Sequence, residues 1–430
     1  MAVPLLSSDC RNTSVDGGWV SDMINVRGGA GGESTRTYLH LLRGARRLFE
    51  PDELDRLLPR RRSDGDAEVK DATPLAATEA IAYDFLARGG KYSRPFITLA
   101  AHDAISGGDA TTADGPDAVA GTPDAVRRVA LAIEAFHKAS LVHDDIQDND
   151  DHRYGVPALH KQHGVATAIN VGDYLIGLGY RMVAGDSVDL GPDAAADVLQ
   201  KLAESHTRLC EGQGAELRWR DGDDKRIKPI DALQIYALKT SPAFEAAMYG
   251  GLRAAGPVDA PLTDATRELA KHVGVAFQIL NDLKDWQGDD DNKLAAGGDV
   301  LSGRPTLLLA LALEALDKEA ADRLLTLVGS NGDADSSDAG IIEQVRVLYR
   351  EAGVFDRAQR LVDRHQERAE QIADDLPSEP LRRLAYYLID TVLERPAEST
   401  PQLVRMKILD AAANVEAANV EAAAAGPAQA

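Results

Sequence analysis

Acidic residues at helical spacing are the strongest chemical signal in this sequence. In the segment HDDIQDNDDHRYG, which begins at His143, Asp144 and Asp148 stand four residues apart and follow an apolar run. Residues at this spacing share one helix face, with Asp151 a turn further on. Two carboxylates on one face repel each other unless a cation lies between them, and Mg²⁺ prefers oxygen ligands. The segment therefore predicts a magnesium site, although a solvated acidic face is the ordinary fate of such a run.

A second acidic segment, FQILNDLKDWQGDDD, gives weight to the metal interpretation. Asn281, Asp285 and Asp289 follow one another at four-residue steps, and Gln278 lies one turn earlier. A helix end that sheds charge into solvent accounts for the run that starts at Asp289. It does not account for Asn281 and Asp285, which directly follow the apolar FQIL.

Two motifs contain cations suited to binding a diphosphate. In GGKYSRP, Lys91 and Arg94 follow a glycine pair at a predicted helix junction, three residues apart. They are placed to clamp one diphosphate, unless the segment is a solvated loop. In YALKTSPAF, Lys239 and Thr240 lie in an apolar helix, where a lysine needs an anionic partner or must reach solvent at the helix end.

Three further segments add polar residues to the set. His137 lies two turns before the first aspartates, a position at which a histidine is more often structural than functional, and His143 is interpreted as structural. The segment CEGQGAEL places Gln213 and Glu216 on one helix face. After the second acidic segment, DVLSGRPT offers Arg304 from a loop.

Helices are the elements expected to position these residues. The chain has 430 residues, of which 44% are hydrophobic, and apolar residues recur at spacings of three and four. This pattern predicts an all-α bundle. We expect three parts: an N-terminal extension (1–72), partly disordered with one short helix around Thr37 to Leu58, a helical domain (73–395), and a low-complexity C-terminal tail (396–430).

Charge and cysteine content exclude several classes of function. The net charge of −22 disfavours binding to nucleic acid or to anionic membranes. The two cysteines, Cys10 and Cys210, argue against a disulfide framework and for a reducing, cytoplasmic location. The N-terminus lacks the features of a secretory signal, and the longest apolar run, Leu307 to Leu313, is too short to span a bilayer.

Taken in order, the motifs resemble those of a known family. GGKxxRP, DDxxD, GQxxE, KT, FQxxND and GRPT are similar to the motifs of the trans-isoprenyl diphosphate synthases, the polyprenyl synthetase family of isoprenoid biosynthesis. The resemblance implies a transferase that condenses an allylic prenyl diphosphate with isopentenyl diphosphate, head to tail, into a longer trans-polyprenyl diphosphate. It also implies a helical bundle around a deep apolar cavity, usually homodimeric, with the two acidic motifs facing each other across the mouth.

The resemblance assigns a role to each motif residue. About three Mg²⁺ ions would be held by Asp144, Asp148, Asn281 and Asp285. The residues implied in catalysis are Asp144, Asp145, Asp148, Lys239, Thr240, Gln278 and Asp282. The residues implied in substrate binding are Lys91, Arg94, His137, Arg153, Lys239, Gln213 and Arg304, of which the first three form the isopentenyl diphosphate site.

Three residues before the first acidic segment are predicted to set product length: Phe136, Ala139 and Ser140. Ala139 is small and should not block a growing chain, whereas Phe136 lies deeper and is placed to form a floor. At a helix rise of roughly 1.5 Å per residue, this position predicts a product of about geranylgeranyl size.

Two departures from the family pattern support rival interpretations. The family has two arginines where this chain has Arg153 and Tyr154, and the missing arginine helps to bind isopentenyl diphosphate. The second acidic motif begins with Asn281, which carries no charge. Asn281, Asp285 and Asp289 also mimic the metal triad of class I terpene cyclases, which share this fold and need no isopentenyl diphosphate.

Other residues favour the synthase over its rivals. A cyclase has no use for the cations of the isopentenyl diphosphate site, Lys91 and Arg94, or for His137. A non-catalytic partner subunit is the third interpretation, but such subunits lose aspartates from one or both motifs, and this chain keeps nearly all of them. The sequence therefore favours a synthase.

Overall fold

Nearly all of the described chain is helical. The computed structural model describes residues 44–58, 72–107, 121–286, 297–328 and 338–393. Within these ranges the only strands are β1 (His152–Arg153) and β2 (Val156–Pro157), an antiparallel pair that pairs His152 with Pro157 just after the first acidic segment. The all-α prediction is confirmed.

Among the described residues, the helices follow one another in this order along the chain. They are α3 (Pro51–Leu57), α4 (Ala77–Ala87), α5 (Ser93–Ser106), α7 (Asp124–Gln147), α8 (Leu159–His163), α9 (Val165–Gly185), α10 (Pro192–Arg220), α11 (Pro229–Ala255), α12 (Ala260–Asp285), α13 (Gly298–Leu301), α14 (Leu307–Ala315), α15 (Lys318–Leu327), α16 (Asp338–Glu351), α17 (Val354–Asp374) and α18 (Glu379–Val392).

Local signals fix where several of these helices begin. Asp259 accepts a hydrogen bond from the Leu262 backbone at the start of α12 (2.9 Å), and Thr306 accepts one from the Leu309 backbone at the start of α14 (3.2 Å). Such caps satisfy backbone N–H groups that the first turn leaves unpaired. Proline in the first turn of α10, α11 and α12 costs no hydrogen bond there. The starts of α12 and α14 are therefore set by their own sequence.

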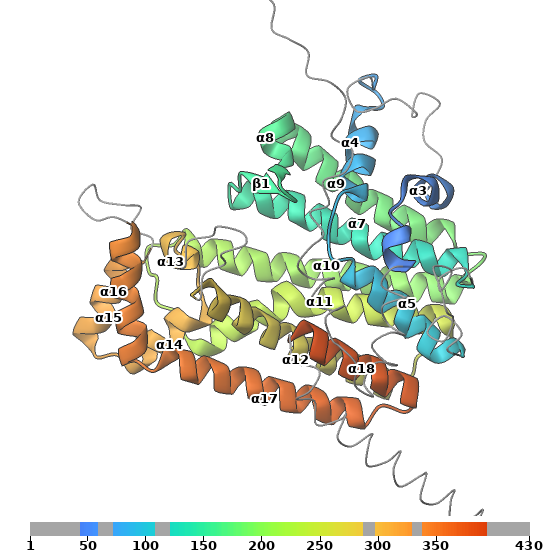
Figure 1. Cartoon of the computed structure of the whole chain (residues 1–430). Coiled ribbons are helices and arrows are strands. Elements are labelled where there is room, and N and C mark those ends of the chain that lie inside the picture. The colour runs from blue at the N-terminus through green and yellow to red at the C-terminus, as the bar shows by residue number, and fades with distance from the viewer. Residues whose placement is uncertain (1–43, 59–71, 108–120, 287–296, 329–337, 394–430) are drawn as a thin grey trace, which may run out of the picture. The chain divides into compact units, whose positions relative to one another are not determined.

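The long helices α7, α9, α10, α11 and α12 pack into the bundle that carries the motifs. In Figure 1, α10 and α11 run side by side through its centre, and α17 passes along its lower side next to α12. Glycine allows α10 and α11 to approach closely: a Cβ at Gly212 of α10 would lie 2.7 Å from Leu238 of α11, closer than side chains normally pack. As a result, Gln213 and Lys239 lie on adjacent helices that are drawn close together.

The N-terminal stretch 44–58 packs onto the bundle. Leu48, Phe49 and Leu54 are buried, and all described residues fall within one compact unit, Tyr38–Glu394. The helix expected around Thr37 to Leu58 is α3 with a further helical turn at 44–47. Residues 1–43 and 394–430 lie outside the described residues, so the predicted domain boundaries stay predictions.

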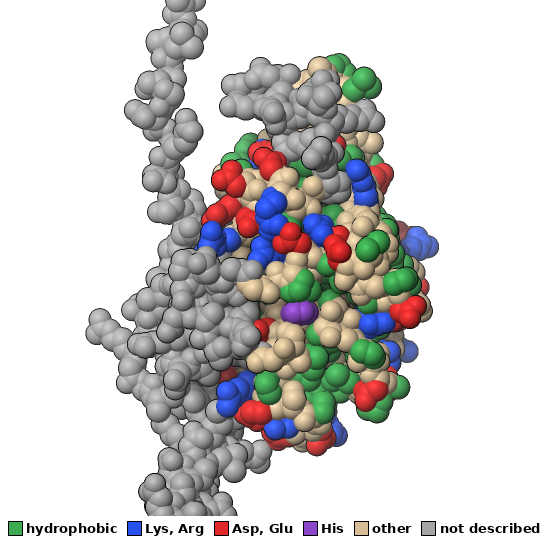
Figure 2. All heavy atoms as spheres, turned by 90° about the vertical axis from the view of Figure 1, so that its right-hand side faces the viewer, with side chains coloured by type: hydrophobic (Ala, Val, Ile, Leu, Met, Phe, Trp, Pro, Cys, Tyr) green, Lys and Arg blue, Asp and Glu red, His purple; other side chains and the backbone are tan. Residues whose placement is uncertain are grey.

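The surface mixes both signs of charge. In Figure 2, acidic and basic side chains alternate over the upper part of the face shown, with hydrophobic side chains below them. The excess of acidic residues is therefore not gathered into a single-sign field on that face. Among the described helices, none has the length and apolarity that crossing a membrane requires.

Candidate active site

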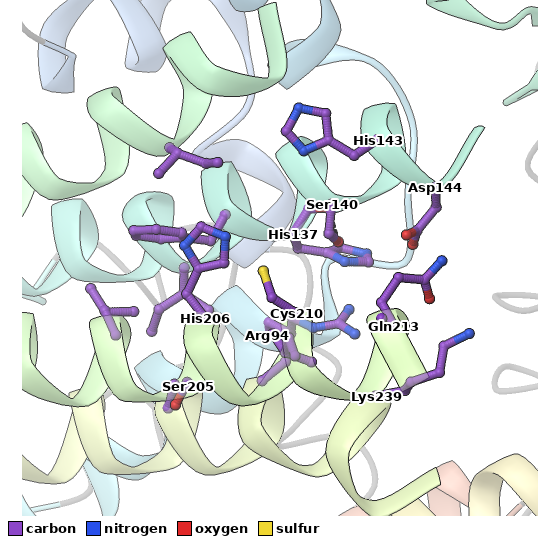
Figure 3. Close-up of a pocket in the computed structure, with 18 of the residues that line it drawn as sticks. Arg94, His137, Ser140, His143, Asp144, Ser205, His206, Cys210, Gln213 and Lys239 are labelled. Carbon is purple, nitrogen blue, oxygen red and sulfur yellow. Dashed lines mark hydrogen bonds between the residues drawn. The ribbon is translucent and has the colours of Figure 1, made fainter. Parts of the chain in front are cut away.

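A largely apolar cavity of about 260 Å³ lies between α7, α9, α10 and α11. On α7 its wall is made by residues at three- and four-residue spacing, because these share one helix face: Ile133, Phe136, His137, Ser140 and Asp144. From α10 and α11 come Leu202, His206, Leu209, Cys210, Gln213, Lys239 and Ala246. Figure 3 shows Asp144, Gln213 and Lys239 at one end and Ser205 and His206 at the other. The cavity therefore has a charged mouth and an inner part that holds most of its apolar side chains.

The first acidic wall is the C-terminal end of α7. Burial raises the pKa of Asp144 to about 6, with the charge of Lys239 opposing that rise and the charge of Asp148 adding to it. Asp148 follows the last helical residue and pairs with two arginines, Arg220 Nη1 at 2.8 Å and Arg304 Nη2 at 3.1 Å. Two adjacent carboxylates thus share a site that is short of solvent.

Asp145 has a different environment from its neighbours. Its side chain is buried and accepts a hydrogen bond from Nε of Arg153 at 2.9 Å. Burial raises the pKa of Asp145, and the guanidinium of Arg153 counteracts the rise. The structure therefore places Asp145 where it holds Arg153, on the strand after α7.

The second acidic wall is the C-terminal end of α12 with the segment after it. A polar recess next to the cavity is lined by Asn281, Asp285, Asp299 and other residues. The carboxylate of Asp285 accepts backbone hydrogen bonds from Gly298 (3.2 Å) and Asp299 (3.4 Å). Burial and the charge of Asp285 raise the pKa of Asp299 to about 6. A second pair of crowded carboxylates thus lies here, and Asp289 is outside the described residues.

Asp282 lines the same recess but serves a structural contact. It is buried and accepts a hydrogen bond from the Tyr236 hydroxyl, which in turn accepts one from the Leu307 backbone at 2.7 Å. Burial and the nearby charge of Asp299 hold the pKa of Asp282 well above its usual range. This network fastens the start of α14 to α12.

Two cationic side chains, those of Lys239 and Arg304, lie where the cavity and the polar recess meet. Lys239 lines both, and its Nζ lies 2.7 Å from Oε2 of Glu216. Arg304 reaches Asp148 on the first wall (3.1 Å) and Asp299 on the second (3.3 Å). The two acidic motifs, more than 130 residues apart in sequence, therefore border one site at one end of the bundle, near the labels β1 and α13 in Figure 1.

The donor set fits a hard divalent cation. In the part of the chain that the structure describes, no three His, Cys, Asp or Glu side chains are already gathered around one metal position. However, the charge of Asp148 raises the pKa of Asp144, and the charge of Asp285 raises the pKa of Asp299. A cation would relieve both repulsions, and carboxylate oxygens are the ligands that Mg²⁺ and Ca²⁺ prefer.

Of the three residues predicted to bind isopentenyl diphosphate, Arg94 and His137 line the cavity, whereas Lys91 does not. Lys91 is exposed, and Arg94, in the first turn of α5, lines the cavity beside the Phe244 ring. The buried Nε of Arg94 has no hydrogen-bond partner among the described residues. Burial holds the pKa of His137 well below its ordinary value, and the charges of Arg94, Lys138 and Arg153 lower it further. The imidazole is therefore neutral in a cation-rich surrounding.

Amide and hydroxyl side chains complete the mouth. Nε2 of Gln278 donates to Oγ1 of Thr240, which links α12 to α11 next to Lys239. Nε2 of Gln213 donates to Oε1 of Gln147 at 2.7 Å, which links α10 to α7. These contacts bring four of the helices that carry motifs to one place.

The inner part of the cavity contains an aromatic cluster. The Phe136 ring meets Tyr180 edge-on at 4.8 Å and His206 at 5.6 Å. Gly179 of α9 makes room for it, since a Cβ there would lie 2.7 Å from the Phe136 ring. Ser140 lines the cavity, and the predicted roles of Ser140 and Ala139 in product length stay predictions. Ala139 is fully buried and does not line the cavity, because it points about a hundred degrees of helix rotation away from Ser140.

Sequence reasoning missed four residues that the structure places at or next to the site. Asp299 begins the DVLSGRPT segment, and Arg220 follows Glu216 by four residues, so both had a spacing signal. His206, in the cavity wall, and Lys138, near Arg94 and His137, gave no such spacing signal. Only their contacts with residues distant in sequence set them apart from other histidines and lysines.

Comparison with known proteins identifies similar chains. The family model of the polyprenyl synthetases matches residues 76–345. A short chain isoprenyl diphosphate synthase of Methanothermobacter thermautotrophicus is 28% identical over 330 residues, which cover 76% of this chain and 93% of the relative. A geranylgeranyl diphosphate synthase of Methanosarcina mazei is 26% identical over 346 residues, which cover 78% and 96%.

A solved structure has the same architecture. The polyprenyl synthase of Caulobacter crescentus CB15, complexed with calcium and isoprenyl diphosphate, aligns with a TM-score of 0.65 at 25% identity. The alignment covers 86% of this chain and 99% of that one. The predicted helical bundle is confirmed.

Proposed function

Because this chain belongs to the polyprenyl synthetase family, as its motifs predicted, we propose that it is a magnesium-dependent prenyltransferase. It condenses an allylic prenyl diphosphate with isopentenyl diphosphate to give a longer trans-polyprenyl diphosphate. One observation carries the proposal: Arg304 joins Asp148 of the first acidic motif to Asp299, which lines the same recess as Asn281 and Asp285 of the second, next to the apolar cavity.

The charged mouth binds and ionises the allylic diphosphate. When bound, Mg²⁺ held by Asp144, Asp148, Asn281 and Asp285 supplies Lewis-acid stabilisation of the leaving diphosphate. Lys239 and Arg304, which pair with carboxylates in the free protein, turn their charges to the diphosphate oxygens. Breaking the allylic carbon–oxygen bond leaves its electron pair on the diphosphate, and fixed cations lower the barrier to that step.

The residues around Arg94 and His137 bind the second substrate, and the apolar cavity holds the carbocation formed from the first. Lys91, Arg94 and the neutral His137 hold isopentenyl diphosphate beside Asp144. Its double bond attacks the allylic carbon, a carbon–carbon bond forms, and the released diphosphate or a nearby polar group removes the proton. Thr240 and Gln278 present their dipoles near the reacting carbons. The apolar wall keeps water from the carbocation.

The product is of about geranylgeranyl size. One relative carries the name geranylgeranyl diphosphate synthase, and another, from Natronomonas pharaonis, the name geranylfarnesyl diphosphate synthase. The Phe136 ring, deep in the cavity wall, supports a floor at this length. A cyclase is not favoured, because Arg94 and His137 line the cavity together with Asp144.

Incubation of the purified protein with Mg²⁺ and each allylic diphosphate, from dimethylallyl to geranylgeranyl, tests the proposal. With isopentenyl diphosphate present, mass analysis should find longer diphosphates, and EDTA should abolish them until Mg²⁺ is restored. Hydrocarbons or alcohols formed without isopentenyl diphosphate would indicate a cyclase. Absence of turnover with every substrate would indicate a non-catalytic subunit.

The protein is further proposed to be a cytoplasmic homodimer. On the outer face of α9, Val165 and Ile169 are exposed apolar residues one helix turn apart, which supports an interface there. The small number of cysteines supports a reducing compartment. Light scattering of the purified protein should give the mass of two chains, and a mass of one chain would contradict the dimer.

A further inference from the structure

A buried lysine lies directly beneath the glycine turn that precedes Lys91. Lys138 of α7 has no exposed surface, and its Nζ donates to the backbone carbonyls of Arg88 and Gly89, the latter at 2.6 Å. A buried ammonium is costly unless hydrogen bonds and charges compensate it. The carbonyl contacts and the nearby Glu134 carboxylate provide that compensation, and burial lowers the pKa of Lys138 only to about 8. The side chain is therefore charged at neutral pH.

The ring of Tyr154 covers this ammonium. Nζ of Lys138 lies 4.2 Å from the centre of the Tyr154 ring, within the range of a cation–π contact. The same ring lies against the glycine turn, since a Cβ at Gly89 would be 3.0 Å from it. Tyr154 belongs to the turn between β1 and β2 and itself has a positive φ of 55°. Two segments, α7 and the hairpin, thus hold the turn from one side.

The turn needs such support because its backbone is unusual. Gly89 and Gly90 have φ of 33° and 128°, and Tyr92, which precedes α5, has φ of 51°. Only glycine adopts the first two conformations easily, and a tyrosine in the left-handed region is strained. The direction of Lys91 and the start of α5, with Arg94 in its first turn, both depend on this conformation. If the carbonyl of Arg88 or Gly89 lost its hydrogen bond from Lys138, the turn could change to a less strained conformation.

We propose that Lys138 and Tyr154 are positioning residues for isopentenyl diphosphate: they lock the Gly89–Gly90 turn so that Lys91 and Arg94 face one diphosphate. This inference rests on the proposed function and deepens it. Lys138 cannot touch the substrate, because it is fully buried behind the turn. It also gives a physical reason for a tyrosine at 154, where the family resemblance leads one to expect an arginine: an arginine there would set a second cation against Lys138.

Steady-state kinetics of Lys138→Met and Tyr154→Leu test the proposal. Each variant should raise the KM for isopentenyl diphosphate on the order of tenfold, the size of one lost charge-assisted contact. The KM for the allylic diphosphate and kcat at saturation should change less than about twofold, because those depend on the other side of the mouth. A role in general stability would instead move all three parameters or none.

Lys201→Met is the matched control, because Lys201 is another buried lysine, held by Glu245 at 2.9 Å away from the turn. It should lower the melting temperature without changing the KM for isopentenyl diphosphate. If Lys138→Met does not fold, Tyr154→Leu decides, since Tyr154 is 38% exposed and tolerates replacement. A wild-type KM in the folded variants would overturn the inference alone. Lack of elongation by the wild-type protein would overturn the proposed function.

Discussion

At the scale of single residues, the mouth of the cavity is an arrangement of opposite charges that hold one another until substrate arrives. Asp148 pairs with Arg220 and Arg304, and Lys239 pairs with Glu216. These pairs are partly buried, so removing one partner leaves a charge that is costly to bury. The cations are therefore kept in place near the carboxylates that are proposed to bind the metal.

Asp144 is the residue whose loss should be most damaging to catalysis. Asp144→Asn keeps the size of the side chain and removes the charge, so the turnover rate at saturating Mg²⁺ should fall by about a hundredfold or more. Asp151→Asn is the matched control, because Asp151 lies in the same segment, is exposed and pairs with Lys161 at 3.0 Å. Product formation measured by mass analysis decides, and near-normal turnover of Asp144→Asn would remove Asp144 from the metal site.

At the scale of elements, helix spacing predicted which residues share one helix face. It did not predict how that face is rotated relative to the neighbouring helices. On α7, Phe136, Ser140 and Asp144 follow one another at four-residue steps and all line the cavity. Ala139 does not, because a sequence shows the period of a helix more reliably than the exact angle at which it meets its neighbours.

Contacts between distant segments were beyond prediction for a physical reason. Lys138 donates to Gly89 and Arg220 to Asp148, partners 49 and 72 residues apart. Which residues meet at such separations depends on how the helices cross, and a single sequence carries no measure of that. The roles that the resemblance assigned to individual residues remain predictions for the same reason.

The proposed product floor depends on how α7, α9 and α10 pack around Phe136. Phe136→Ala should remove the ring that meets Tyr180 and His206, and the product should lengthen by one or more isoprene units. Ala139→Ser changes the next turn of the same helix outside the cavity and should leave the product unchanged. Mass analysis of the products distinguishes the two. An unchanged product from Phe136→Ala would place the floor elsewhere in the cavity.

The contact between α12 and α17 should make stability depend on pH. Nδ1 of His272 and Nδ1 of His365 are 2.9 Å apart, so one neutral ring donates to the other. Burial lowers the pKa of His365 to about 4, with the charge of His272 adding to the effect. The folded pKa is below the unfolded one, so the unfolded state takes up more protons as pH falls below about 6.5.

Stability should therefore fall as pH decreases from 7 to 5. The expected loss from this pair is about 1 kcal/mol, a value reduced for the partial exposure of the rings. Urea unfolding of the wild type and of His365→Gln at both pH values measures it, and the variant should lose less stability than the wild type. Equal losses in the two proteins would show that the pair is not responsible.

At the scale of the whole molecule, the N-terminal stretch 44–58 reaches the proposed diphosphate site. Phe49, which is 4% exposed, stacks on Tyr92 with ring centres 4.5 Å apart. Tyr92 is the strained residue between Lys91 and α5. The glycine turn is thus supported by α7 and the hairpin, and Tyr92, two residues after the turn, is supported by a segment that precedes the matched family region.

Phe49→Ala should then affect both stability and substrate binding. Removing a buried ring of this size costs about 3 kcal/mol, and the melting temperature should fall accordingly. Because Tyr92 loses its stacking partner, the KM for isopentenyl diphosphate should rise while the KM for the allylic substrate stays near the wild-type value. Leu75→Ala is the control, since Leu75 is 80% exposed and its loss should change neither quantity. A variant that melts lower but keeps the wild-type KM would show that the N-terminal stretch stabilises the bundle without shaping the diphosphate site.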